Sequence, residues 1–250
     1  MLNFPNTRFL SLIIPGLLTL ACGKSLFESV EKGDDAVDAT LKMEQGDPGG
    51  AISILTSALS NNPTDYQLVS LLASAQAQLA GIDIVSVALN MATADNTDQD
   101  TNEVTALFSA LPEATDGNIA QLDQAVATMQ SIPETERTTA DNFKLTLFHS
   151  SAMGLRTKSF DEDGDGQVSP VELLDMDEED AIAIIDSILS AEGALSASVQ
   201  GGDGAAVSSD KISDIREQID AQEGDTQSDK LRNYLAGGDS DAATTTTLTD

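Results

Sequence analysis

The chain has 250 residues, with 42 acidic side chains against 12 lysines and arginines, so its formal net charge at pH 7 is −30. A charge of this sign repels the phosphates of nucleic acids and of anionic lipids, and we expect no nucleic-acid partner. Aromatic residues make up 4% of the sequence and tryptophan is absent, which leaves few rings for stacking on bases or sugars. The composition favours cations and basic proteins as partners.

The first 21 residues have the pattern of a signal peptide. Arg8 precedes an apolar run from Phe9 to Ala21, which is too short to span a bilayer as a helix. A buried first helix is the alternative, but Pro5, Pro15 and Gly16 would break it. We therefore predict that residues 1–21 are a lipoprotein signal peptide.

The stretch "LTLAC" that ends this segment resembles the lipobox of bacterial lipoproteins, with Ala21 before Cys22 and with Thr19 where that family favours leucine. The resemblance implies that Cys22 is acylated and anchors the chain to a lipid bilayer. Cys22 is also the only cysteine, so no disulfide can form within the chain. If the host is a Gram-negative bacterium, Gly23 after the cysteine, in place of aspartate, resembles lipoproteins sent to the outer membrane. This resemblance implies a location there, facing the periplasm or the cell surface.

Apolar residues recur at helical spacing almost everywhere, and no alternating run resembles a strand, so we expect an all-α fold. Residues 22–95 predict short helices joined by tight turns. Asp47 caps a helix that has Pro48 in its first position, and Thr64 with Gln67 predicts a capping box for the next helix.

The order of small and apolar residues in this part resembles a tetratricopeptide repeat. Ala51, Leu55, Ala58 and Pro63 fall on the pattern of its second helix, and the resemblance covers roughly residues 32–92. It implies antiparallel helical hairpins. The alternative is an ordinary helical hairpin packed on its neighbours.

The rest of the chain continues the helical pattern. Residues 96–158 predict further helices, and residues 177–236 predict C-terminal helices interrupted by the flexible linker "SVQGGDGAAVSS". In the first of those C-terminal helices Ile182, Ile185 and Leu189 share one face. We expect residues 237–250 to be disordered, because they contain almost nothing that a core could bury.

Between these helices, residues 161–172 read "DEDGDGQVSPVE". Their spacing matches the calcium-binding loop of an EF-hand, in which hard oxygen ligands alternate along twelve residues and a glycine stands at the sixth. Gly166 permits the sharp turn, and Val168 is the apolar residue at the eighth position. The predicted ligands are Asp161, Asp163, Asp165, the Gln167 carbonyl, Ser169 directly or through water, and Glu172 with both oxygens.

This segment therefore resembles an EF-hand over residues 159–176, which implies that the cofactor is Ca²⁺. Phe160 before the loop, with Leu173 and Leu174 after it, should be the inward contacts of flanking helices, the second of which starts near Val171. The alternative is a solvated acidic turn in an acid-rich chain.

EF-hands usually occur in pairs, and the sequence contains no second complete loop. The nearest candidate, Asp98-x-Asp100-x-Asn102, has Glu103 where the glycine is required and Ser109 where the glutamate should be. Val168 then pairs with a degenerate partner, packs on neighbouring helices, or contacts a second molecule.

Three classes of function remain open. The first is a calcium-binding, lipid-anchored scaffold or binding module, whose ion is a permanent brace and whose protein partner is unidentified. The second is a substrate-handling periplasmic lipoprotein of a TRAP-type transporter, which the lipobox and the tetratricopeptide-like helices resemble. The third is a hydrolase that uses a pair of carboxylates. We expect no enzyme, because His149 is the only histidine and no nucleophile motif accompanies it.

Overall fold

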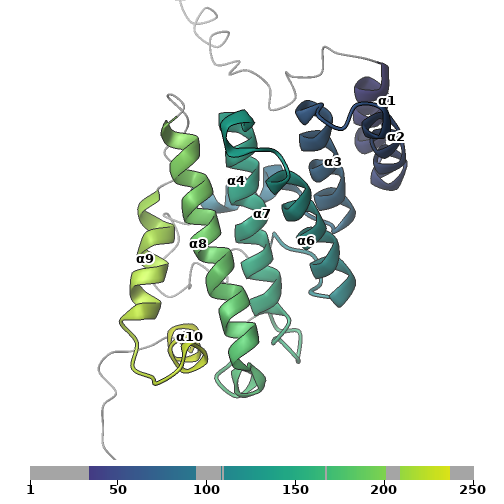
Figure 1. Ribbon diagram of the computed structural model, residues 1–250. Coiled ribbons are helices and arrows are strands. Elements are labelled where there is room, and N and C mark those ends of the chain that lie inside the picture. Colours follow the sequence, from purple (N-terminus) through teal and green to yellow (C-terminus); the bar gives the residue numbers. More distant parts are fainter. Residues whose placement is uncertain (1–33, 94–107, 109, 167, 201–208, 237–250) are drawn as a thin grey trace, which may run out of the picture.

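The computed structural model describes residues 34–93, 108, 110–166, 168–200 and 209–236, and these residues form helices without a strand, which confirms the all-α prediction (Figure 1). The leader, Cys22, Gln167, the loop from Asp98 and the last fourteen residues lie outside the described residues. The helices are α1 (Asp34–Glu44), α2 (Pro48–Asn61), α3 (Tyr66–Leu79), α4 (Ile84–Thr93), α6 (Asp116–Gln130), α7 (Thr139–Lys158), α8 (Glu178–Gln200), α9 (Ser209–Asp220) and α10 (Gln227–Leu235), with short 3₁₀ turns η2 (Glu134–Glu136) and η3 (Glu172–Asp175).

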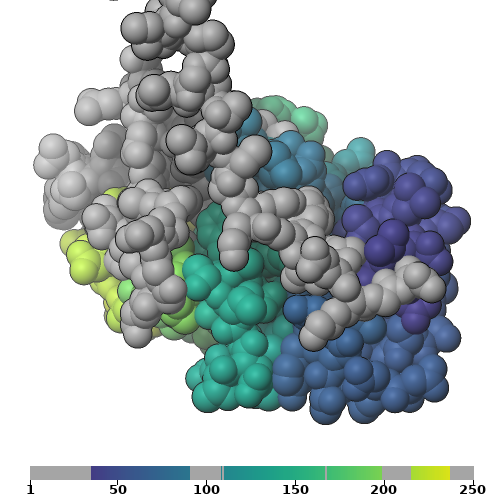
Figure 2. All heavy atoms as spheres, turned by 90° about the horizontal axis from the view of Figure 1, so that it is seen from above, coloured from purple at the N-terminus to yellow at the C-terminus, as the bar shows by residue number. Residues whose placement is uncertain are grey.

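The helices form an array in which most of them pack on a helix near them in the chain, and α4 packs on α7. α1 packs on α2, α2 on α3, α3 on α6, α6 on α7 and α7 on α8, while α9 and α10 pack on α8. In Figure 1 α1 and α2 lie at one side of the molecule and α9 and α10 at the other. Seen from above, the N-terminal helices (purple) and the C-terminal helices (yellow) are likewise separated (Figure 2).

The turns between the first helices follow from a few capping residues. Asp47 caps α2 by accepting a hydrogen bond from the amide of Gly50, and Pro48 starts the helix, as predicted. The capping box predicted at Thr64 is wrong, because the N-cap of α3 is Asp65, whose carboxylate accepts from the amide of Leu68. Aspartate competes successfully for this position since its charge also suits the positive end of the helix.

Two hydrophobic clusters fill the interior. The smaller one joins α1, α2 and α3 through Ala36, Ala39, Ala51, Leu55, Leu68, Leu71 and Ala75. The larger one starts on the other side of α3 with Val69, Ala73 and Ala77 and continues through α6, α7 and α8 to α9 and α10. Helix α3 therefore contributes to both clusters.

Helix α8 is longer than the sequence predicts, and it buries a different face. It runs to Gln200, so the first residues of the predicted linker are helical. Ile182 and Leu189 are 45% and 40% exposed, and the buried stripe is instead Ala181, Ile184, Ile188, Ala191 and Leu195. The stretch Glu178–Ser198 is long and apolar enough to cross a membrane by length and composition alone. Here its buried stripe packs into the larger cluster.

Candidate metal centre

The acidic loop lies where the chain leaves α7 and before it enters α8. Helix α7 ends at Lys158 with Ser159 as its C-cap, and Glu172 begins η3. Phe160 packs against the larger cluster and Leu173 is 1% exposed, so both inward contacts agree with the prediction. The prediction for Leu174 is wrong, because that side chain is 69% exposed.

Three aspartates converge in the loop. One carboxylate oxygen from each of Asp161, Asp163 and Asp165 lies within 4.8 Å of the other two. Asp161 is half-buried, whereas the other two are exposed. Like charges this close repel one another, and a bound cation relieves that repulsion.

Backbone amides fix the conformation of the first half of the loop. The carboxylate of Asp161 accepts hydrogen bonds from the amides of Gly164 (2.9 Å), Asp165 (3.1 Å) and Gly166 (3.0 Å). The amide of Asp165 also donates to Asp163 Oδ1 at 3.0 Å. The chain therefore wraps around Asp161, which draws the next two aspartates toward it.

Two glycines make this wrap possible. Gly166 has φ +84°, as expected for the sharp turn, and Gly164 has φ +72°, a requirement that the sequence analysis missed. A Cβ atom at either position would meet nothing within 4 Å, so the glycines are needed for backbone conformation and not for space.

Glu172 spans the loop from its end to its start. Its carboxylate accepts hydrogen bonds from the amides of Ser169 (2.7 Å), Glu162 (2.9 Å) and Asp163 (3.3 Å). The hydrogen bonds with Ser169 are the main cause that holds the pKa of Glu172 below its ordinary value. Its oxygens are not among those that lie within 4.8 Å of one another, so the carboxylate stands beside the three aspartates and not between them.

The chain after the loop differs from the prediction. In place of a helix starting near Val171, the single 3₁₀ turn η3 is followed by α8, which starts at Glu178. Leu173 and Met176, three residues apart, are both buried, which suits the threefold repeat of a 3₁₀ turn. The new helix is then capped by Asp177, whose carboxylate accepts from the amide of Asp180 at 2.9 Å.

The oxygen ligands suit a hard cation. Carboxylates and a hydroxyl are the donors that calcium prefers, and neither nitrogen nor sulfur ligands are among the predicted set. Of that set, the structure brings together Asp161, Asp163 and Asp165, places the Glu172 carboxylate beside them on the amides of Glu162 and Asp163, and does not describe Gln167. Ser169 lies next to Glu172, to whose carboxylate its amide donates. Val168 is half-buried against the larger cluster, so of its three proposed environments it takes the neighbouring helices.

A second polar site is a groove of about 280 Å³ between α6, α7 and α8. His149 lines it, and its Nε2 lies 3.3 Å from Nε2 of Gln130, a contact in which the amide donates to a neutral ring. Burial is the main cause that lowers the pKa of His149 to about 4, so the ring is uncharged at neutral pH. Arg156 at the other end of the groove donates to Asp123 Oδ1 at 2.6 Å. The polar groups at both ends are thus satisfied from within the protein.

Comparisons with protein-family models, with curated proteins and with solved structures found no match to this chain. The class that the described residues define is an all-α helical array with an acidic loop able to hold a metal ion.

Proposed function

We propose that this protein is a calcium-binding helical scaffold, anchored to a membrane by acylated Cys22, and that its ion is a permanent structural brace. The observation that carries the calcium proposal is the convergence of Asp161, Asp163 and Asp165 within 4.8 Å, in a loop that wraps around the first of them. Glu172 would add its carboxylate and Ser169 its hydroxyl or a water. The ion would supply charge neutralisation and no bond-making chemistry.

The proposal that the ion is a structural brace follows from the packing of the side chains at the two ends of the loop. Phe160 and Leu173 both pack into the larger cluster, so an ion between the aspartates and Glu172 would tie α7 to η3. Extracellular EF-hands bind calcium with Kd values of about 10⁻⁴ to 10⁻³ M, and an exported protein would meet calcium at such levels. A site with a Kd of about 10⁻⁴ M in about 10⁻³ M calcium is roughly nine-tenths filled, so it changes little with concentration.

Calorimetric titration of calcium into the metal-stripped chain from Gly23 onward tests the site. We expect saturable binding of one ion, which Glu172→Gln abolishes or weakens strongly. Glu162→Gln is the matched control, since it removes an exposed acid of the same loop that is not a predicted ligand. Equal losses in the two variants would mean that calcium responds to general charge and not to a built site.

A thermal denaturation series distinguishes a brace from a solvated acidic turn. A ligand that binds only the folded state stabilises it by about 2.7 kcal/mol at one hundred times Kd. We expect the melting temperature of the metal-stripped protein to rise with calcium and to stay constant in Glu172→Gln. An unchanged melting temperature in the parent protein would contradict the structural role.

The lipid anchor rests on the sequence "LTLAC" alone and needs its own test. We expect the chain produced in a Gram-negative bacterium to incorporate a labelled fatty acid and to fractionate with the outer membrane. Cys22→Ser should lose the label and leave the membrane fraction. A membrane-bound, unlabelled Cys22→Ser protein would contradict the proposal.

The groove beside His149 gives less support to the two other functions. A carboxylate-based hydrolase would need two acids aligned on one bond, and Asp123 in the groove is already paired with Arg156. A transporter component would need a cavity that encloses its substrate, and this groove is open and lined at both ends by groups that bind each other.

A further inference from the structure

The metal loop is connected to the C-terminal helix α10 by a short stretch of chain. Glu172, the last residue of the loop, is six positions before Glu178, the first residue of α8. Between them η3 is fixed by Leu173 and Met176, each 1% exposed in the larger cluster. Glu172 is therefore joined to a segment whose position is fixed by the core.

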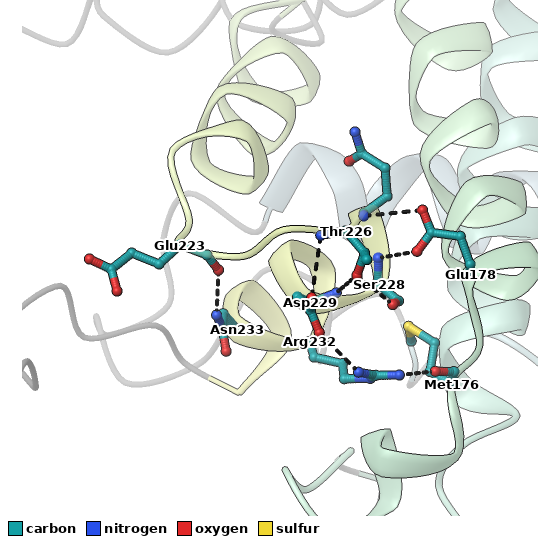
Figure 3. A network of polar contacts seen from close by, with 9 residues as sticks. Met176, Glu178, Glu223, Thr226, Ser228, Asp229, Arg232 and Asn233 are labelled. Atoms are coloured by element: carbon teal, nitrogen blue, oxygen red, sulfur yellow. Dashed lines mark hydrogen bonds and ion pairs between the residues drawn. The ribbon is translucent and has the colours of Figure 1, made fainter. Parts of the chain in front are cut away.

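Helix α10 binds this stretch at two points (Figure 3). Arg232 donates through Nη2 to the carbonyl of Met176. The carboxylate of Glu178 accepts hydrogen bonds from the amides of Gln227 (3.2 Å) and Ser228 (3.0 Å), the first two residues of α10. These bonds, led by that from Ser228, hold the pKa of Glu178 below its ordinary value, as a carboxylate at the positive end of a helix requires.

The remaining contacts hold α10 in place against the rest of the protein. Thr226 caps the helix in a capping box with Asp229, and Asp229 also receives a bond from Arg232 Nη1 at 3.3 Å. Leu231, 1% exposed, packs α10 into the larger cluster. The helix is thus held by one apolar contact region and by the polar contacts to Met176 and Glu178.

We propose that α10 positions the second half of the calcium loop, so that calcium binding and the docking of α10 strengthen each other. This inference rests on the proposed calcium site. It assigns to α10 the support that a second hand gives in a paired EF-hand, here delivered through Arg232 and Glu178. Arg232 and Glu178 are positioning residues, since they act on the loop through Met176 and η3 and do not contact the predicted ligands.

The coupling between calcium binding and the docking of α10 can be measured from either side. Calcium would fix Glu172 and hence η3, which lowers the frequency with which α10 opens from α8. By reciprocity, a protein in which α10 is loosened must bind calcium more weakly by the same factor. Coupling energies between linked sites usually correspond to a change of about 5-fold or more.

Hydrogen exchange of the intact protein, with and without saturating calcium, tests the first half of this relationship. We expect calcium to slow the exchange of the amides of α10 about 5-fold or more, while the amides of α2, at the other end of the array, keep their rates. Binding of calcium without any change in α10 would overturn this inference and leave the calcium site intact. Failure to bind calcium would overturn both.

Calcium affinity in variants of α10 tests the second half. Arg232→Gln and, separately, Glu178→Gln should weaken calcium binding about 5-fold, although both lie outside the loop. Arg232→Lys, which keeps a donor for the Met176 carbonyl, should recover part of the affinity. Arg216→Gln is the matched control, because Arg216 is a half-exposed arginine of α9 with surface ion pairs to Glu192 and Asp220.

The comparison of affinity with stability separates positioning from a general loss of structure. Arg216→Gln should leave the calcium affinity unchanged. If Arg232→Gln and Glu178→Gln lower the melting temperature but bind calcium as tightly as the parent, α10 only stabilises the fold, and the proposal is wrong. Two different variants keep the test valid where one of them fails to fold.

Discussion

The ammonium group of Lys144 donates a hydrogen bond of 3.1 Å to the hydroxyl of Ser70, 74 residues earlier in the chain, and thereby joins α7 to α3. Ser70 in turn donates to Asp141 Oδ1 at 2.5 Å. All three side chains are buried. Burial lowers the pKa of the Lys144 ammonium, and the charge of Asp141 opposes that effect. Without Asp141 the buried ammonium would have no compensating charge.

Removing the acid from this cluster should cost more than removing the base. In Asp141→Asn the buried ammonium loses its compensating charge, and we expect a loss of about 3 kcal/mol or more in the free energy of unfolding. Lys144→Met leaves Asp141 bonded to Ser70 and Thr138 and should cost less. Thr138→Ala, which removes the cap of α7 and one of the hydrogen bonds to Asp141 but leaves both charges in place, should cost about 1–2 kcal/mol. Urea denaturation of the three variants measures the order, and equal losses for Asp141→Asn and Lys144→Met would contradict it.

His149 should make the protein less stable as the pH falls. Its pKa is about 4 in the folded protein and about 6.5 when unfolded, so the unfolded state binds more protons between these values. The stability is complete above pH 6.5 and decreases as the pH falls toward 4, by about 2 kcal/mol at pH 5. Denaturation of the parent and of His149→Asn at pH 7.5 and 5 isolates this contribution. A constant difference between the two proteins would show that the ring does not titrate in this range.

The two glycines of the loop should respond to alanine through the backbone alone. Gly164→Ala and Gly166→Ala place a side chain at positive φ without a clash, and each should cost about 1–2 kcal/mol in the metal-free protein. Gly49→Ala is the control, because that glycine lies in the first turn of α2 with equal space and no positive φ. We expect Gly49→Ala to be neutral or stabilising by up to about 1 kcal/mol. Thermal denaturation with chelator present provides the measurement.

Two adjacent leucines after the loop offer a test of the 3₁₀ turn. Leu173 is buried and Leu174 is 69% exposed. Leu173→Ala should therefore lower the free energy of unfolding by about 2–5 kcal/mol, and Leu174→Ala by less than about 0.5 kcal/mol. Similar losses in both variants would mean that a regular helix, with both leucines inward, follows the loop.

Much of the helical structure could be predicted from local signals. Asp47 with Pro48 marks the start of α2 through contacts within a few residues, and such contacts depend little on the rest of the fold. The first half of the loop could be predicted for the same reason, because Asp161 and its amide donors lie within five residues.

The faces of the helices could not be predicted as well. Val85 and Leu89 of α4 are more than 60% exposed, while Val87 is fully buried. Where helices approach closely, small residues such as Ala36 and Ala39 fill the contact, and larger apolar residues beside them remain at the edge. A search for the largest apolar side chains therefore selects the wrong stripe.

Contacts between segments far apart in the sequence could not be predicted from any local sequence pattern. Arg232 and Met176 are 56 residues apart, and Ser70 and Lys144 are 74 apart, yet each pair fixes how two elements meet. The same holds for Glu172, whose 3₁₀ turn depends on the burial of Leu173 and Met176 in a core formed by other helices. These features depend on the tertiary fold, which the pattern of a single segment does not contain.

Helix α3 divides the interior, since Leu68, Leu71 and Ala75 belong to one cluster and Val69, Ala73 and Ala77 to the other. We expect this division to separate two cooperative folding units, so that α1 and α2 open and close while the unit that contains the metal loop stays intact. A force applied to the amino-terminal side of the chain would unfold the smaller unit first, and the rest of the molecule would stay folded until that unit had opened.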